Sequence, residues 1–241
     1  MQIRLNKYIS DSGLMSRRKA DDAISCGEIE VNDQTITELG TKIDSDKDMI
    51  KYNGRLVVNG SKTVYYALYK PNGVISTARD EQGRQDVTSL VPRSPRVYPV
   101  GRLDAYSEGL MILTNDGELT QKLTHPSFEH EKEYEVTTHI SDEELRFKTN
   151  LIGYLKKCFI DGLEIEGKKM KADRIFIKDN DKSLNLDLVL HTGYNRQIRK
   201  MCAKIGLGVS KIKRTRIGKL NLNALNLKPG DYKEINLSQI I

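Results

Sequence analysis

Apolar residues near the start of the chain recur at helical spacing. Leu5, Ile9 and Leu14 fall roughly on one face, which predicts a first short helix. Ser16 has the side chain of an N-cap, so we expect a second helix over residues 17–26. A pair of short helices is therefore predicted at the start of the chain.

A strand pattern follows these helices. Residues 28–33 alternate apolar and polar side chains and run into a turn, and Asn53-Gly54 is a strong signal for a hairpin. Two helices followed by a few small strands form a minimal α+β module. We therefore predict a small domain over residues 1–60, a short linker at 59–62, and a larger domain over 61–241.

The larger segment mixes strand and helix patterns. Short apolar or alternating runs predict strands, and amphipathic runs predict helices. The expected strands cover residues 64–69, 110–113, 133–136 and 184–190, and the expected helices cover 118–123 and 198–205, with another helix opening at Ser141. Pro71-Asn72-Gly73 predicts a turn after the first of these strands. The pattern is that of a mixed α+β domain.

Composition narrows the class of protein. The 241 residues carry a formal net charge of +6, which modestly favours a polyanionic partner. The three cysteines and four histidines show no ligand spacing, so we expect neither a metal site nor a disulfide framework. No signal core or membrane-length apolar stretch is present, so we expect a cytoplasmic protein that binds no membrane.

The placement of charge is more informative than its sum. One block without any acid carries Arg196, Arg199, Lys200, Lys204, Lys211, Lys213, Arg214, Arg216 and Lys219. A solvated helix face usually mixes both signs, so this block predicts a phosphate-bearing partner. Five more cations surround the two N-terminal helices: Arg4, Lys7, Arg17, Arg18 and Lys19. Such a face can dock an RNA backbone, and composition alone leaves an ordinary solvated surface equally open.

Two long motifs resemble known sequences. Residues 4–21, Arg-Leu-Asn-Lys-Tyr-Ile-Ser-Asp-Ser-Gly-Leu-Met-Ser-Arg-Arg-Lys-Ala-Asp, with Gly-Glu-Ile-Glu-Val-Asn following, resemble an S4 RNA-binding domain. Gly-Arg-Leu-Asp at 101–104, with Ser-Glu-Gly-Leu at 107–110 and Leu-Thr-Asn-Asp-Gly at 113–117, resembles the catalytic motif of the RsuA/RluB/RluF pseudouridine synthases.

Three shorter motifs are similar to the same family. They are Tyr-Lys-Pro-Asn-Gly at 69–73, Lys-Glu-Tyr-Glu-Val at 132–136 and Asn-Arg-Gln-Ile-Arg-Lys-Met at 195–201. A single tetrapeptide occurs by chance, but these motifs fall in the expected order and cover nearly the whole chain. The resemblance implies an S4-like module and a catalytic domain with a central, largely antiparallel mixed sheet, flanking helices and a cleft across the sheet.

The resemblance also implies a reaction. Pseudouridine formation breaks the glycosidic C–N bond of a uridine and rejoins the ribose to carbon 5 of the same base. No atom is gained or lost, so no cofactor is expected. The reaction needs a carboxylate close to the ribose C1′ and the uracil ring, and Asp104 matches the family residue in that role. Without the motif, the same aspartate would read as a cap or turn residue.

Four more residues match family positions in the pocket. Tyr134 matches the tyrosine that stacks on the flipped base, and Ile198 supports the other face. Arg199 matches the arginine that pairs with the catalytic aspartate and keeps it ionised. Arg102 matches the arginine that fills the gap left in the RNA, although a surface ion pair is an alternative.

The remaining cations are expected at the RNA backbone. They are Arg196 and Lys200 beside Arg199, then Lys211, Lys213, Arg214 and Arg216, and the N-terminal set Arg4, Lys7, Arg17, Arg18 and Lys19. The chain departs from the family pattern at Ala105-Tyr106, where an aromatic group follows the catalytic motif. Tyr106 is expected either to contact RNA or to pack.

The partner is expected to be ribosomal RNA. The 195–201 motif resembles the RluF-like branch, which implies large-subunit rRNA, with small-subunit rRNA or a tRNA as alternatives. A non-catalytic S4-type assembly factor is a rival, but it would have no use for Asp104, Tyr134 and Arg199 together. A glycoside hydrolase would need a paired carboxylate, which the motifs lack. No symmetric interface signal is present, so we expect a monomer.

Overall fold

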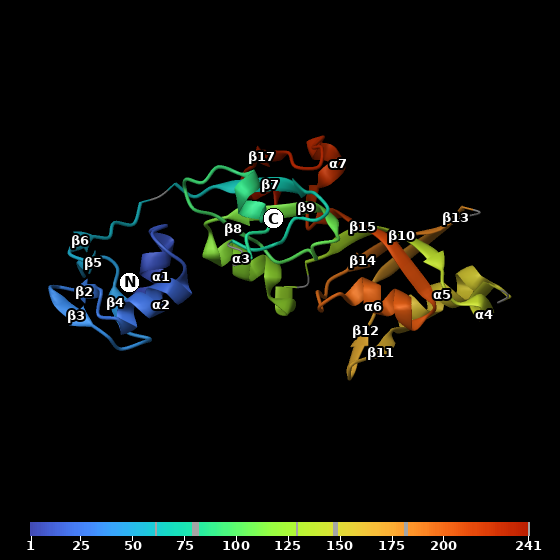
Figure 1. Ribbon diagram of the computed structural model, residues 1–241, viewed down its shortest axis with the longest axis horizontal. Coiled ribbons are helices and arrows are strands. Elements are labelled where there is room, and N and C mark those ends of the chain that lie inside the picture. Colours follow the sequence, from blue (N-terminus) through green and yellow to red (C-terminus); the bar gives the residue numbers. More distant parts are fainter. Residues whose placement is uncertain (61, 79–81, 129, 147–148, 181–182, 241) are drawn as a thin grey trace. The chain divides into compact units, whose positions relative to one another are not determined.

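A computed structural model describes residues 1–60, 62–78, 82–128, 130–146, 149–180 and 183–240 (Figure 1). The chain forms two compact units. The first comprises Met1–Val64, Pro92–Tyr98 and Thr114–Gly117, and the second comprises Tyr65–Val91, Pro99–Leu113 and Glu118–Ile241. Ser61, in the predicted linker, lies outside the described residues, and the domain boundary at residue 60 stays a prediction.

The first unit packs two helices with small sheets. Its helices are α1 (Leu5–Asp11) and α2 (Arg17–Ser25), and its strands are β1 (Gln2–Arg4), β2 (Ile29–Val31), β3 (Gln34–Ile36), β4 (Lys42–Asp44), β5 (Ile50–Tyr52) and β6 (Arg55–Leu56). The sheet order is β3-β2-β5-β6, and β1 pairs with β4. Leu5, Ile9, Ile24, Ile29 and Ile50 form its buried core.

The local signals in this unit are confirmed with one exception. The Ser16 side chain accepts from the amide of Lys19 as the N-cap of α2, and β5 and β6 form the hairpin at Asn53-Gly54. The prediction for Leu14 was wrong. Helix α1 ends at Asp11, and the left-handed turn at Gly13, with φ of +82°, leaves Leu14 49% exposed.

The second unit is built on one large sheet. The order of its main strands is β13-β14-β10-β15-β9-β7-β17, with β16 paired to β15 and β8 to β9. These strands are β7 (Tyr65–Lys70), β8 (Tyr98–Pro99), β9 (Glu108–Thr114), β10 (Lys132–Ile140), β13 (Arg174–Asn180), β14 (Ser183–Leu190), β15 (Leu207–Ile217), β16 (Leu220–Asn221) and β17 (Tyr232–Glu234). The β15–β9 pair is parallel, whereas β10 is antiparallel to both β14 and β15. This confirms the predicted mixed, largely antiparallel sheet.

Helices and a small hairpin flank this sheet. The helices are α3 (Gly117–Thr124), α4 (Glu143–Arg146), α5 (Leu151–Asp161), α6 (Gln197–Lys204) and α7 (Leu222–Leu225), with 3-10 turns η1 (Val87–Leu90), η2 (Pro126–Phe128) and η3 (Leu237–Gln239). The hairpin is β11 (Leu163–Ile165) and β12 (Lys168–Met170). Helix α5 packs against β13 and α6 against β15 (Figure 1). Within the described ranges, no helix is long and apolar enough to cross a membrane.

The strand and helix predictions for this segment are confirmed. Leu184, Leu186, Leu188 and Leu190 are all buried from β14, as their alternation predicted. The helix predicted over 198–205 is α6. The sequence reading missed β13, α5 and the long strand β15, whose polar and charged residues hid its strand pattern.

Gly109 allows β9 to approach β15 closely. Its φ is +113°, and an added Cβ would lie 2.3 Å from the carbonyl oxygen of Arg214. We expect Gly109→Ala to lower the free energy of unfolding by about 3 kcal/mol or more, because the substitution adds a backbone clash to an unfavourable φ. Thermal and urea unfolding measure this change.

Gly230 gives a matched control for that measurement. Its φ is +96°, but an added Cβ would meet no atom within 4 Å. Gly230→Ala is therefore expected to cost only about 1–2 kcal/mol, the penalty of the conformation alone. Equal losses from both variants would show that the β9–β15 approach does not constrain Gly109.

Candidate active site

Asp104 lies in the loop between β8 and β9, beside a small pocket in the second unit. The pocket has a volume of about 90 Å³. Six residues predicted for the site line it: Arg102, Asp104, Tyr134, Arg196, Ile198 and Arg199. The Asp104 loop, the sheet and the N-terminal end of α6 thus meet here, although they are far apart in the sequence. Lys200 is not among the lining residues, because its ammonium pairs with Glu166 at 2.6 Å.

A buried lysine holds the Asp104 loop. Lys70 ends β7, and its side chain is fully buried. Its ammonium donates to the carbonyl oxygens of Ser107 at 2.7 Å, Pro71 at 3.0 Å and Ala105 at 3.2 Å. An ammonium has three donors, so these acceptors satisfy all of them. Two of the three belong to the loop that carries Asp104, and the sequence reading assigned Lys70 no such role.

Other contacts fix the same loop from the 71–76 turn. The amide of Gly73 donates to the carbonyl of Ala105 at 2.8 Å. The Ser76 hydroxyl donates to the carbonyl of Leu103 at 2.7 Å and accepts from the Leu103 amide at 3.0 Å. The loop on both sides of Asp104 is therefore held before any ligand arrives, which favours a preorganised carboxylate.

Burial also shapes the electrostatics below this loop. Desolvation, reinforced by the charge of Arg214, lowers the pKa of Lys70 to about 8, while Asp104 and Glu108 oppose that shift. Burial and Arg214 likewise lower the pKa of Lys132. Arg214 thus acts on the charges of both Lys70 and Lys132 within the second unit.

Arg214 is a correction to the sequence prediction. It was expected on the RNA-binding surface, but its side chain is buried, with 3% of the residue exposed. Its Nε donates to the carbonyl of Leu110 at 2.8 Å, so it ties β15 to β9. Its Nη2 atom has no hydrogen-bond partner among the described residues. Arg214 therefore contributes positive charge from within the fold and does not present it to solvent.

Tyr134 and Ile198 give the pocket apolar walls. Tyr134 is buried in β10, and Ile198 is buried in the first turn of α6. Both line the pocket with Asp104. The Asp104 carboxylate makes no hydrogen bond or ion pair with any other residue that the structure describes. A pocket with apolar walls can hold a planar ring. A carboxylate without a hydrogen-bond partner can react with an electrophilic carbon at the edge of that ring.

The structure differs from the prediction at Arg199. Its guanidinium donates to the carbonyl oxygens of Tyr106, at 2.6 Å, and Val209, at 3.5 Å, and makes no ion pair with Asp104. The Tyr106 carbonyl belongs to the Asp104 loop, so Arg199 holds this loop through its backbone. Arg199 and Asp104 nevertheless line the same pocket.

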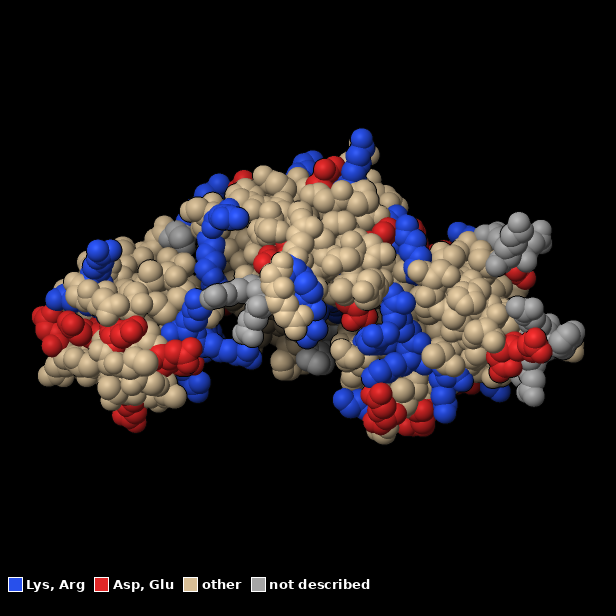
Figure 2. Space-filling model, viewed as in Figure 1, with Lys and Arg blue, Asp and Glu red and all other residues tan. Residues whose placement is uncertain are grey.

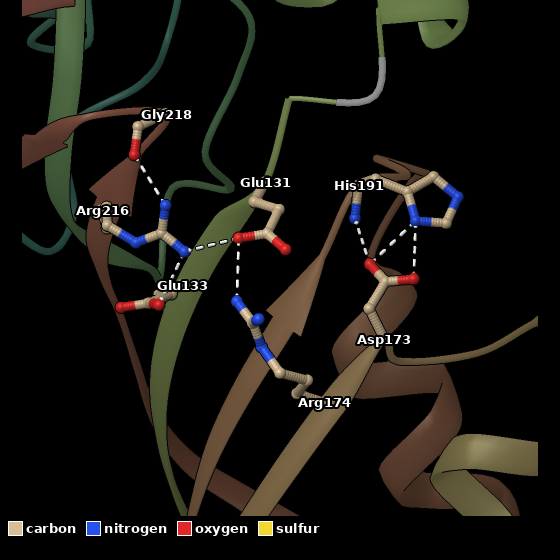
Figure 3. Close-up of polar contacts among 7 residues, drawn as sticks. All are labelled: Glu131, Glu133, Asp173, Arg174, His191, Arg216 and Gly218. Atoms are coloured by element: carbon tan, nitrogen blue, oxygen red, sulfur yellow. Dashed lines mark hydrogen bonds and ion pairs between the residues drawn. The ribbon is translucent and has the colours of Figure 1, made fainter.

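Gln197, to which the sequence analysis assigned no role, holds the 192–196 side of the pocket in place. Its buried side-chain oxygen accepts from the Thr192 hydroxyl at 3.0 Å and the Tyr194 amide at 3.1 Å. Its side-chain nitrogen donates to the carbonyl of Lys171 at 3.3 Å. The neighbouring His191 donates its amide to Asp173 at 2.8 Å, and its Nδ1 lies 2.7 Å from the same carboxylate (Figure 3). The 192–196 segment is thereby anchored at both ends.

Four of the nine cations in the acid-free block pair with acids: Lys200 with Glu166, and three residues of β15 with acids of other segments. The ion pairs are Lys211–Glu108 at 2.9 Å, Lys213–Glu135 at 3.2 Å, and Arg216 with Glu131 at 2.8 Å and with Glu133 at 2.6 Å (Figure 3). The hydrogen bond from Arg216 lowers the pKa of Glu131. The block is therefore less positive than its sequence predicted. Lys and Arg side chains still gather over α6 (Figure 2).

In the first unit, three of the five expected cations lie on one helical turn. Arg17, Arg18 and Lys19 form the exposed first turn of α2, and Arg4 is exposed just before α1. Lys7 pairs with Asp11 at 2.6 Å. Cations at a helix N-terminus oppose the helix dipole, so this arrangement is unfavourable unless an anion is bound nearby.

Comparison with known proteins gives a consistent family. A family model described as RNA pseudouridylate synthase matches residues 64–204. The chain is 39% identical to ribosomal large subunit pseudouridine synthase B of Bacillus subtilis, over 98% of this chain and 93% of that protein. It is 36% identical to the dual-specificity RNA pseudouridine synthase RluF of Escherichia coli K12, over 99% of this chain and 77% of that protein.

Solved structures agree with the fold. The structure is similar to a crystal structure of a pseudouridylate synthase, with a TM-score of 0.63 and 25% identity over 99% of this chain and 98% of that chain. It is also similar to a chain of the archaeal box H/ACA sRNP Nop10-Cbf5 complex, with a TM-score of 0.50 and 20% identity over 66% of this chain and 49% of that chain. The second likeness concerns the fold alone.

Proposed function

The chain belongs to the RsuA/RluB/RluF family of RNA pseudouridine synthases, and from this membership we propose that it converts a specific uridine of large-subunit ribosomal RNA to pseudouridine. The names of the relatives from B. subtilis and E. coli support an RNA substrate, and the first supports the large subunit. The observation that carries the proposal is the Asp104 carboxylate, held in a fixed loop beside the pocket lined by Tyr134 and Ile198.

The pocket residues are proposed to act on a flipped uridine. Tyr134 stacks on the uracil ring, and Ile198 supports its other face. Asp104 attacks the ribose C1′, or stabilises positive charge there, as the glycosidic bond from C1′ to N1 breaks; an ester formed by attack breaks again when carbon 5 of the base bonds to C1′. The base then rejoins the ribose through carbon 5, and the hydrogen that carbon 5 carried is released to solvent.

Two arginines are proposed to support this step. Arg199 binds the Tyr106 carbonyl, two residues beyond Asp104, and lines the same pocket, so its guanidinium is proposed to pair with the carboxylate when RNA excludes water. Arg102 is exposed at the pocket and is proposed to occupy the gap that the flipped uridine leaves. Arg196, exposed at the start of α6, and Lys200 are proposed to contact phosphates.

Residues 1–60 are proposed to be an S4-like RNA-binding domain, because they pair two helices with small sheets and expose Arg17, Arg18 and Lys19 on one turn. We expect the triple change of these three residues to alanine to weaken RNA binding about 10-fold or more at low salt. The slope of log affinity against log salt should fall by up to about 3, because each lost phosphate contact removes close to one released counterion.

The measurement is RNA binding at several salt concentrations. Lys42→Ala with Lys47→Ala and Lys51→Ala is the control, because it removes equal charge from the strands and turns of the same unit. An equal loss from both triple variants would point to general charge attraction and would contradict a specific site on α2.

Tritium release tests the proposed function. Large-subunit rRNA transcribed with uridine labelled at carbon 5 should release tritium with the wild-type protein, because that position exchanges its hydrogen for the ribose. Small-subunit rRNA and tRNA transcribed in the same way are the comparison substrates. Release from small-subunit rRNA or tRNA alone would identify that RNA as the substrate. No release from any of the three RNAs would contradict pseudouridine formation.

A further inference from the structure

Tyr106 is the most exposed aromatic residue among those the structure describes, with 74% of its surface open to solvent. It lies two residues after Asp104 and directly before the buried Ser107. The sequence left open whether it packs or contacts RNA. Its ring makes no ring contact and its hydroxyl no hydrogen bond within the described part of the chain, so it does not pack.

The backbone under this ring is unusually well fixed. The Arg199 guanidinium donates to the Tyr106 carbonyl at 2.6 Å, and the Lys70 ammonium donates to the carbonyls of Ala105 and Ser107 on either side. A tyrosine has only two side-chain torsions, so a ring on a fixed backbone loses little entropy when it binds a partner. Tyr106 does not itself line the pocket, but it lies on the loop between Asp104 and Ser107, which both do.

The surroundings of the pocket suit a single-stranded nucleic acid. Tyr194 lines the pocket from the facing segment, is 38% exposed, and has the Lys168 ammonium 5.1 Å from its ring centroid. Arg102 and Arg196 are exposed among the lining residues. Aromatic rings interleaved with cations are the usual surface for unstacked bases, since the rings stack and the cations hold the phosphates.

We propose that Tyr106 stacks on a base next to the target uridine and thereby helps to select the nucleotide context of the modified site. This inference rests on the proposed function. A uridine that turns into the pocket loses contact with its neighbours, so at least one flanking base must find a new stacking partner. Tyr106 offers that partner from the same loop that carries Asp104, so recognition of the flanking base and placement of the carboxylate share one scaffold.

The test compares Tyr106→Ala, Tyr106→Trp and wild type on large-subunit rRNA labelled at carbon 5 of uridine. We expect Tyr106→Ala to bind this RNA about 10- to 100-fold more weakly, with the turnover rate at saturating RNA within about threefold of wild type. Tyr106→Trp should restore binding, because indole also stacks. The salt slope should not change, because no cation is lost.

Phe176→Ala is the matched control, because Phe176 is a 60% exposed aromatic residue on β13 and not on the loop that carries Asp104. It should bind RNA as wild type does. Wild-type turnover combined with unchanged binding by Tyr106→Ala would overturn the stacking inference and leave the proposed function standing. A fall in turnover at saturating RNA, without a change in binding, would also overturn it. Tight binding without turnover by wild type would contradict the proposed function, while the binding comparison would still decide the role of Tyr106.

Discussion

Asp104→Asn is expected to lower the single-turnover rate of pseudouridine formation by about 10⁴-fold or more, while RNA affinity changes by less than about threefold. An amide has nearly the size of a carboxylate but is neither a nucleophile nor a negative charge. The Asp104 carboxylate has no hydrogen bond or ion pair among the described residues, so the substitution removes no structural contact. The loss should therefore appear in the chemical step alone.

The measurement is tritium release from excess enzyme bound to labelled rRNA, with RNA affinity measured in parallel. Asp116→Asn is the matched control, because it makes the same chemical change in the Asn-Asp-Gly turn after β9, and Asp116 does not line the pocket. Its rate should stay within a few-fold of wild type. Turnover by Asp104→Asn at the wild-type rate would remove Asp104 from the mechanism.

Much of the fold could be predicted because local signals and tertiary structure agree. The Ser16 cap, the Asn53-Gly54 hairpin and the alternation of β14 each fix backbone conformation through nearby atoms. The family and the mixed sheet followed from motifs whose spacing is characteristic, and the comparisons confirm the family. The roles assigned to Asp104, Tyr134 and Arg199 stay predictions, although all three line one pocket.

The charge pattern predicted too positive a surface, because the acids that pair with these cations are far away in the sequence. Arg216 and Lys213 meet Glu133 and Glu135 only through the register of β10 with β15, which the sequence does not display. The sequence around these residues contains no acids, so it predicts a more positive surface than the folded protein has.

Buried cations were missed for a different reason. Lysine and arginine are almost never fully buried unless paired, so the sequence predicts Lys70 in a turn and Arg214 at the surface. Only the fold shows that backbone carbonyls from β9 and the Asp104 loop surround them. The Lys-Pro motif predicts a turn, whereas its lysine also holds the Asp104 loop through backbone carbonyls.

Lys70→Met is expected to lower the rate at saturating RNA by about 100-fold. Methionine replaces the unbranched apolar stem of lysine, but it leaves the carbonyls of Pro71, Ala105 and Ser107 without the ammonium. The Asp104 loop would then shift, and a displacement of about 1 Å is sufficient for a loss of this size. Lys132→Met is the control, because Lys132 is half-buried, has a pKa that burial likewise lowers, and donates to the carbonyls of His130 and His191, outside this loop. Comparable losses from both variants would indicate general destabilisation.

The contacts between Lys70 and the Asp104 loop should also make the rate and the stability depend on pH. The pKa of Lys70 is lowered by burial from its ordinary value of 10.5 to about 8. Above that value the neutral amine has two N–H donors for three carbonyls, so the wild-type rate should fall as pH rises through about 8. The sign for stability is opposite: between about 8 and 10.5 the folded state has lost a proton that the unfolded chain retains, so the contribution of Lys70 to stability rises with pH. Lys70→Met should lose both dependences, and a wild-type rate that stays level up to pH 9.5 would contradict this role of the contacts.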